Sequence, residues 1–340
     1  MKIFIRNSTL IAMLILVFLF NACKKDPPPM PNDAYATLKT YMLVNNLDLP
    51  TLLSGWVVDP FGVSATPPGI VDDATSTIAG YNVYDLRTAA DFATSHIKNA
   101  KNVALKDVIT TTETLGLAKD AKILVVCITG QTAGQAVMAL RLLGWSKAQV
   151  LKWGMAGWNA TFQTPWANNS GFVDPAKGDL AVGNANWVTT AAPANGSFAE
   201  PTLTSASADG AAILRERVQA VLAAGFSTAD GATVLGAPAT YSIVNYWSAA
   251  DYSTFGHFAG AYNIPVISLA NDLVKGFDPS KEMLIYCYTG QTSSVASFWM
   301  NVLGYKTKGI GFGANRMVYT SLKAASKAVY KGPKAWTVTQ

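Results

Sequence analysis

Cysteine and histidine are scarce in this sequence, which holds three cysteines and two histidines among 340 residues. Three cysteines cannot form the dense disulfide framework of a small secreted domain, and so few potential ligands argue against a cysteine and histidine metal site. Charged residues make up only 14% of the chain, and the net charge of +5 is not gathered into a basic stripe of the kind that binds a phosphate backbone. Half of the residues are hydrophobic, which argues against a disordered chain. We therefore expect a folded protein with no bound metal and no nucleic-acid partner.

The first 22 residues have the pattern of a secretory signal peptide. Lys2 and Arg6 precede a hydrophobic run at residues 10–20, about half the ~20 residues that a membrane-spanning helix needs. The Leu-Phe-Asn-Ala segment before Cys23 resembles the lipobox of bacterial lipoproteins, which implies that Cys23 is acylated and heads the mature chain. Residues 23–32 are rich in proline and are expected to form a tether. We expect a location in the cell envelope, at the outer membrane or cell surface, with the lipid anchor as the only membrane link; plain secretion is the alternative.

Two copies of one pattern follow. The segment Tyr-Asn-Val-Tyr-Asp-Leu-Arg at 81–87 aligns with Tyr-Ser-Ile-Val-Asn-Tyr-Trp at 241–247. Val-Cys-Ile-Thr-Gly-Gln-Thr at 126–132 aligns with Tyr-Cys-Tyr-Thr-Gly-Gln-Thr at 286–292, again 160 residues further on. Matched segments at one offset indicate a tandem duplication.

Each copy alternates short hydrophobic runs with helical patterns. Residues 82–86 and 123–127 are typical of buried strands, and residues 132–143 carry apolar side chains at helical spacing. Strands separated by helices predict an α/β fold with a parallel sheet in each copy, and further helices are expected near 33–44 and 211–224. The predicted organisation is a domain at 33–167, a linker at 168–208, a second domain at 209–330 and a tail at 331–340.

A cysteine occupies the same place in both copies. Cys127 and Cys287 each end a hydrophobic strand, and a polar loop with the sequence x-Thr-Gly-Gln-Thr leads from each into a helix. Ligands of parallel sheets bind beyond the carboxyl ends of the strands, where these loops lie. Loop N–H groups and a helix N-terminus favour a thiolate, so we expect a thiol pKa below the ordinary ~8.5. The alternative is an inert buried cysteine that finishes a strand.

In combination these features resemble the rhodanese family of sulfurtransferases. The matching segments are Asp-Leu-Arg at 85–87, the stretches that begin at His96 and His257, the two cysteine loops, and Leu-Lys-Trp-Gly-Met-Ala-Gly-Trp at 151–158. The resemblance spans about residues 70–320. It implies an α/β fold of two rhodanese-like domains, each a parallel sheet flanked by helices on both faces.

The resemblance implies transfer of sulfane sulfur through a cysteine persulfide, without a metal or an organic cofactor. Carried over to this chain, Cys127 and Cys287 are the nucleophiles. The implied donor is a small sulfur-containing anion such as thiosulfate or a persulfide, and the implied acceptor is a thiol or a cyanide-like group. Backbone N–H groups of the loops would cradle the persulfide. The loop residues are Ile128, Thr129, Gly130, Gln131, Thr132, Tyr288, Thr289, Gly290, Gln291 and Thr292.

Other conspicuous polar residues are assigned framework roles by the same resemblance. Asp85 and Arg87 are expected to form an ion pair at the end of a strand. His96 and His257 are expected to organise a turn between a helix and a strand rather than to act as bases.

Departures from the family keep one other function open. The loops lack the cation that holds an anionic donor in many family members, and the second copy has Asn245 and Trp247 where the first has Asp and Arg. A related phosphatase would need Arg at the sixth position after each cysteine, where this chain has Ala133 and Ser293. The chain also lacks the Cys-x-x-Cys pair that is typical of a disulfide oxidoreductase. The alternative is a non-catalytic rhodanese-like binding module at the cell surface. The residues do not decide which of the two cysteines is active.

Overall fold

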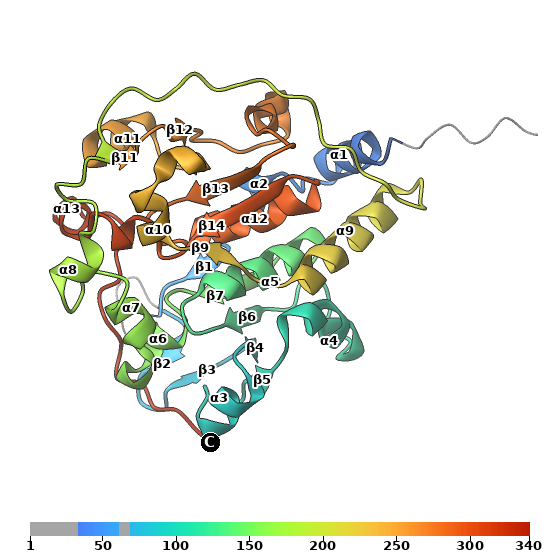
Figure 1. Ribbon diagram of the computed structural model, residues 1–340. Helices are drawn as coiled ribbons and strands as arrows, with labels where there is room; N and C mark the ends of the chain where they lie inside the picture. The colour runs from blue at the N-terminus through green and yellow to red at the C-terminus, as the bar shows by residue number, and fades with distance from the viewer. Residues whose placement is uncertain (1–32, 61–68) are drawn as a thin grey trace, which may run out of the picture.

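The computed structural model describes residues 33–60 and 69–340, which contain two five-stranded sheets (Figure 1). The strand order is β1-β7-β6-β4-β5 in the first sheet and β12-β10-β13-β14-β9 in the second, and every pair of neighbouring strands is parallel. The predicted α/β fold with a parallel sheet in each copy is therefore confirmed. The first sheet consists of β1 (Val57–Val58), β4 (Asn82–Asp85), β5 (Lys101–Asn102), β6 (Ile123–Val126) and β7 (Ala148–Leu151). The second consists of β9 (Thr228–Ala229), β10 (Ser242–Asn245), β12 (Tyr262–Asn263), β13 (Glu282–Tyr286) and β14 (Lys306–Ile310).

Helices surround both sheets. In the first half of the chain they are α1 (Ala34–Val44), α2 (Leu49–Leu52), α3 (Ala89–Thr94), α4 (Val108–Thr114), α5 (Gln131–Leu142), α6 (Met155–Trp158), α7 (Thr164–Ala167) and α8 (Pro175–Gly178). In the second half they are α9 (Gly210–Ala224), α10 (Gly231–Gly236), α11 (Ala249–Phe255), α12 (Gln291–Val302) and α13 (Tyr319–Ala324). The strands and helices expected near 82–86, 123–127, 132–143, 33–44 and 211–224 are all present, with ends that differ by at most one residue.

A layer of helices between the two sheets holds the main core. Helices α5 and α12 lie between the sheets and pack directly on each other, α9 packs on both of them, and α1 packs on α9 (Figure 1). Alternate residues of a strand point to opposite faces, so Ile123 and Val125 of β6 join this central core while Leu124 and Val126 join a separate core on the outer face. Both faces of β6 are thus buried, as its continuous hydrophobic sequence predicted.

The C-terminal residues return to the first sheet, although the sequence pattern predicted only a tail there. Thr339 pairs with His96 through two backbone hydrogen bonds, of 2.8 and 2.9 Å, and the indole N–H of Trp158 donates to the carbonyl of Thr337 at 2.9 Å. The Trp336 ring packs against Trp158 with 4.8 Å between ring centroids. The end of the chain therefore contributes to the outer core of the first sheet.

The linker predicted at 168–208 also has an ordered contact. Its short strand β8 (Trp187–Val188) pairs antiparallel with β11 (His257–Phe258). A separate antiparallel pair, β2 (Val71–Asp72) with β3 (Thr77–Ile78), precedes β4.

The predicted signal peptide, the acylated Cys23 and the tether lie in residues 1–32, outside the described residues. They stay predictions, as do the cell-envelope location and the domain boundaries. Across residues 33–60 and 69–340, no helix combines the length and hydrophobicity needed to cross a membrane.

Candidate active site

The two cysteine loops lie at the carboxyl ends of the central strands β6 and β13. Cys127 directly follows β6 and Cys287 directly follows β13. Each loop turns into its helix through a glycine with positive φ, +83° at Gly130 and +76° at Gly290. A residue with a Cβ adopts this conformation at a cost, which explains glycine at the fourth position of both loops.

The Cys127 thiol is buried and is held by backbone N–H groups. Its side chain is 3% exposed, and Sγ accepts hydrogen bonds from the N–H of Gly130 at 3.1 Å and of Ala133 at 3.4 Å. Burial raises the pKa of this thiol above its ordinary value, because the charged form loses solvation; the surrounding N–H groups act in the opposite direction and only reduce the increase. The expected lowering of the Cys127 pKa was therefore wrong. Desolvation, which the loop sequence does not reveal, outweighs the loop's hydrogen bonds.

A pocket opens at Cys127. It has a volume of about 560 Å³, and its lining includes Cys127, Ile128 and Thr132 of the loop. The lining also includes Arg87, Asp91 and Phe162, which come from other segments of the chain. A small donor molecule could therefore reach the first loop.

Asp85 and Arg87 form the predicted ion pair at the edge of this pocket. The two side chains are 2% and 5% exposed, and the guanidinium contacts the carboxylate through Nε at 3.0 Å and through a terminal nitrogen at 2.6 Å. The same terminal nitrogen donates to the Ser95 carbonyl at 2.7 Å. Because Asp85 neutralises the Arg87 charge, the pocket has less attraction for a dianion than a free guanidinium would give it.

The second loop has different surroundings. Cys287 is 4% exposed, accepts from the Ser293 N–H at 3.4 Å and donates to the Ser293 hydroxyl at 3.6 Å. Trp247 stands in the position of Arg87 and stacks on Tyr288, with 4.8 Å between ring centroids and 14° between ring planes. The Tyr288 hydroxyl donates to Asp251, which also pairs with Lys327 at 2.7 Å. Large, anchored side chains therefore occupy the region that corresponds to the open edge of the first pocket.

A backbone turn hydrogen-bonds to each cysteine; it follows β7 in the first copy and β14 in the second. Trp153 and Gly154 have φ values of +69° and +61°, and Phe312 and Gly313 have φ values of +61° and +53°. The next N–H in each turn donates to a cysteine carbonyl: Met155 to Cys127 at 2.8 Å, and Ala314 to Cys287 at 3.0 Å. The second copy thus forms the same turn from Gly-Phe-Gly-Ala at 311–314, where the first copy has Lys-Trp-Gly-Met at 152–155. An aromatic residue followed by glycine was the signal common to both.

Replacing Gly154 by alanine should lower the free energy of unfolding by about 3 kcal/mol. Its backbone, with φ 61° and ψ −151°, is in a region that is essentially restricted to glycine, and a Cβ would lie 2.2 Å from the Cys127 carbonyl oxygen. Chemical denaturation measures the loss. Gly225→Ala is the matched control, because its φ of 79° and ψ of −179° carry similar strain while a Cβ meets no described atom within 4 Å. We expect about 1.5 kcal/mol there, and equal losses in the two variants would contradict a tight fit behind Cys127.

The two histidines occupy equivalent places outside the cysteine loops. His96 stacks on Phe92 with 3.9 Å between centroids, and His257 stacks on Tyr252 with 3.6 Å. One ring nitrogen of each lies near the carbonyl of its stacking partner, at 2.9 and 3.3 Å. The described lining of the Cys127 pocket includes neither histidine. Their predicted framework role stays a prediction that this placement favours.

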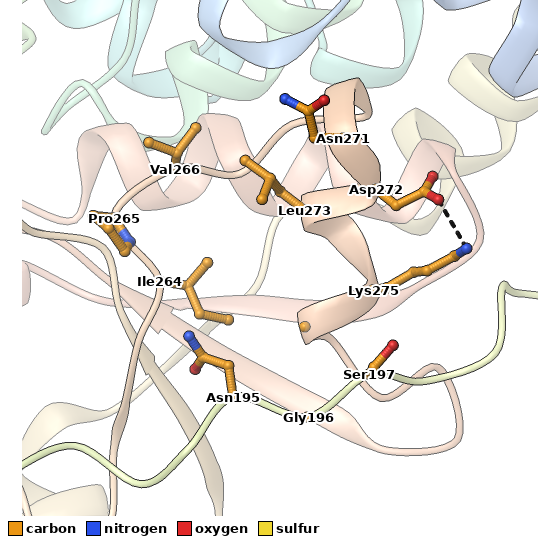
Figure 2. A pocket seen from close by; sticks show the side chains of 11 residues that line it. Asn195, Gly196, Ser197, Ile264, Pro265, Val266, Asn271, Asp272, Leu273 and Lys275 are labelled. Atoms are coloured by element: carbon orange, nitrogen blue, oxygen red, sulfur yellow. Dashed lines mark hydrogen bonds and ion pairs between the residues drawn. The ribbon is translucent and has the colours of Figure 1, made fainter.

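A second pocket, of about 640 Å³, lies between residues 195–197 and residues 264–276 (Figure 2). Its lining combines the apolar Ile264, Val266 and Leu273 with the ion pair of Asp272 and Lys275, whose atoms are 2.9 Å apart. None of its lining residues is a cysteine or histidine.

Within the described part of the chain, no group of three or more Cys, His, Asp or Glu side chains could hold a metal ion.

Solved structures resemble this chain at low identity. A rhodanese-related protein from Thermoplasma volcanium is 25% identical over 22% of this chain and 73% of its own, with a TM-score of 0.20. A thiosulfate sulfurtransferase from Pseudomonas aeruginosa is 13% identical, with a TM-score of 0.27; the match covers 91% of this chain but only 50% of that protein. A 3-mercaptopyruvate sulfotransferase from Escherichia coli is 15% identical over 75% of this chain and 97% of its own, with a TM-score of 0.26. A search of the curated proteins finds no match.

The family comparison concerns the first cysteine loop. The family model described as "Rhodanese-like domain" matches residues 71–161, which include β4, β6, the Cys127 loop and the supporting turn at Trp153 and Gly154. Because the solved structures have low TM-scores, the assignment rests on this match and on the parallel sheet that carries the loop. Residues 71–161 of this chain therefore match the rhodanese-like domain family, and they contain the Cys127 loop.

Proposed function

We propose that this protein is a rhodanese-type sulfurtransferase in which Cys127 carries the transferred sulfur. The observation that carries the proposal is the position of Cys127, at an open pocket with its sulfur facing the N–H groups of Gly130 and Ala133. The family match of residues 71–161 supports the same chemistry.

In the proposed reaction the Cys127 thiolate attacks the outer sulfur of a donor. A bond forms between Sγ and that sulfur while the donor's own sulfur–sulfur bond breaks, and the electron pair leaves with the donor's remaining thiolate or sulfite. The product is a persulfide on Cys127, whose terminal sulfur carries the negative charge. An acceptor nucleophile, a thiol or a cyanide-like group, then attacks the terminal sulfur and releases the Cys127 thiolate. The cycle needs no external oxidant or reductant, since the donor supplies sulfur at the oxidation level that the acceptor receives.

The loop would act on the charge that develops during this cycle. N–H groups already aimed at the Cys127 sulfur need no rearrangement to stabilise a thiolate or a persulfide anion. The raised pKa of Cys127 means that little thiolate is present near neutral pH, so we expect transfer to become faster as the pH rises toward that pKa.

Of the two cysteines, Cys127 has the better-suited surroundings. Trp247, Tyr288 and Asp251 form an anchored cluster beside the Cys287 loop, whereas a pocket of about 560 Å³ lies beside Cys127. This difference supports one working site, in the first copy.

The pocket also favours one kind of donor. Its only cationic lining residue, among those described, is Arg87, whose charge is paired with Asp85, and Asp91 adds a carboxylate to the same lining. A monoanionic persulfide is repelled less by Asp91 than a dianion is, so we propose a persulfide donor in preference to thiosulfate.

The alternative is a non-catalytic module that binds a sulfur species or a partner. The raised Cys127 pKa favours it, because a thiol that stays protonated is a weak nucleophile.

One experiment separates the two functions. The purified protein is incubated with thiosulfate, mercaptopyruvate or a low-molecular-weight persulfide, and added sulfur is measured by intact mass and located by peptide mapping. We expect one added sulfur on the Cys127 peptide, formed fastest from the persulfide. If neither cysteine gains sulfur from any of the three donors, the binding module replaces the enzyme.

A further inference from the structure

The two cysteine loops touch each other across the junction of the two copies. Gln291, in the loop of Cys287, donates from its side-chain nitrogen to the Thr129 carbonyl in the loop of Cys127, at 2.9 Å. Ser294 donates to the Gln131 carbonyl at 2.9 Å, and the Gln131 side-chain oxygen accepts from the Phe312 N–H at 3.1 Å. These contacts join residues more than 160 positions apart in the sequence.

We infer that Gln291 is a positioning residue for the Cys127 site: it fixes the peptide unit whose N–H faces the Cys127 sulfur. This inference rests on the proposed function, in which Cys127 carries the sulfur.

The geometry of one peptide bond links Gln291 to Cys127. Thr129 supplies the carbonyl of the peptide unit that joins it to Gly130, and Gly130 supplies its N–H. A trans peptide unit is planar, so its carbonyl and its N–H point in opposite directions and turn together. The carbonyl accepts from Gln291 at 2.9 Å, and the N–H donates to Sγ of Cys127 at 3.1 Å. Fixing the carbonyl therefore also aims the N–H at the sulfur.

This peptide unit would otherwise be easily rotated. Gly130 has a φ of +83° and no side chain to restrict its backbone. The Thr129 carbonyl has one further partner, the indole N–H of Trp166 at 3.3 Å, which is the longer of its two hydrogen bonds. The amide of Gln291 also lies so close that a Cβ on Gly130 would be 2.2 Å from its nitrogen. Gln291 thus supplies the shorter of two bonds that restrain a flexible unit.

The second copy does not receive the same support in return. Gln131 lies over Gly290, where a Cβ would be 2.6 Å from its side-chain oxygen, but that oxygen accepts from Phe312 and not from the Cys287 loop. The glutamine of the second loop therefore has a role at the first site, although Trp247 and Tyr288 crowd the surroundings of its own cysteine.

The test replaces Gln291 and measures the reactivity of Cys127 against pH. Gln291→Met keeps the length of the side chain but has no donor, and Gln291→Glu places a carboxylate oxygen against the Thr129 carbonyl. Iodoacetamide modification of the full protein is followed by peptide mapping, which distinguishes Cys127 from Cys287. Arg87 and Asp91, the charged groups that line the Cys127 pocket, are unchanged in every variant.

We expect the alkylation profile of Cys127 in Gln291→Met to move upward by about 0.5–1 pH unit, with modification near neutral pH about three- to tenfold slower. Gln291→Glu should move it further in the same direction. Sulfur loading of Cys127 should slow by a similar factor. The control is Gln135→Met, because Gln135 is a glutamine of the neighbouring helix α5 that is similarly buried, 5% exposed against 3% for Gln291. It should leave the profile of Cys127 in place.

An unchanged Cys127 profile in folded Gln291→Met and Gln291→Glu would overturn the inference. If both variants fail to fold, Gln291→Asn keeps a buried amide but shortens the side chain by one methylene, so that it no longer reaches the Thr129 carbonyl and should shift the profile in the same direction. No shift in that variant overturns the inference as well. The proposed function fails separately: a protein that never takes up sulfur but shows the shift retains the positioning role of Gln291 and loses the sulfurtransferase activity.

Discussion

Cys127→Ser should abolish sulfur loading of the protein, whereas Cys287→Ser should retain most of it. A serine hydroxyl is far less acidic than a thiol and is a weak nucleophile, and the N–H groups of the loop alone do not activate it. Cys127 lines an open pocket, while Cys287 lies beside the stacked rings of Trp247 and Tyr288. Loading with a persulfide donor, measured by intact mass, gives the amount of sulfur on each variant.

The pair of variants is its own control, since both remove one buried thiol from equivalent loops. Peptide mapping identifies which cysteine carries the sulfur in each. Sulfur found on Cys287 in Cys127→Ser, together with none on Cys287→Ser, would move the active site to the second copy. Equal loading of both variants would show two working sites and contradict the assignment to Cys127 alone.

Arg87→Leu should lower the free energy of unfolding by about 4 kcal/mol, because it leaves the Asp85 carboxylate buried without its partner. Asp85 and Arg87 have side chains only 2% and 5% exposed, and two guanidinium nitrogens contact the carboxylate. The backbone N–H of residue 87 still donates to Asp85 in the variant, but this hydrogen bond does not neutralise the charge of the carboxylate. Chemical denaturation followed by tryptophan fluorescence measures the loss.

The second copy suggests the control for this prediction. There Asn245 and Trp247 occupy the positions of Asp85 and Arg87. The backbone N–H of Trp247 donates to the Asn245 side chain at 3.1 Å, and the backbone N–H of Arg87 donates to the Asp85 side chain at 3.0 Å. The double variant Asp85→Asn, Arg87→Trp has no unpaired charge and should be more stable than Arg87→Leu. Lys106→Leu, which breaks the exposed pair with Asp107, should have little effect. A double variant as unstable as Arg87→Leu would show that lost packing of Arg87, and not the buried charge of Asp85, determines the loss.

The strands, helices and glycine turns around the cysteine loops could be predicted, because each depends on residues that are close together in the sequence. Continuous hydrophobic runs predicted the strands β4 and β6, and apolar residues at helical spacing predicted the helix α5. Gly130 and Gly290 indicated turns that need a positive φ. The repeated pattern placed Cys127 and Cys287 at equivalent strand ends, since side chains that follow a hydrophobic strand in a parallel sheet lie at its carboxyl edge. The ion pair of Asp85 and Arg87 was expected from the resemblance to the rhodanese family, and the structure contains it.

Other features depended on residues that are distant in sequence. The turn at Phe312 and Gly313, which hydrogen-bonds to the Cys287 carbonyl through Ala314, was not predicted because its residues differ from those of the first copy. The return of residues 331–340 to Trp158 and His96 left no periodic signal, since an extended segment held by one isolated β-bridge and a few side-chain contacts has none.

The sequence by itself determined that this chain has two cysteine loops on parallel sheets and that residue types at both loops are nearly the same. Only the tertiary structure decided how the loops differ: burial raises the Cys127 pKa, a pocket opens beside that cysteine, and Trp247 with Tyr288 crowds the other. It also placed Gln291 of the second loop against Thr129 of the first. Desolvation, access and contacts between distant loops depend on what surrounds a residue in space. The two cysteines occupy equivalent places in the sequence, and the packing of the two copies gives them different surroundings.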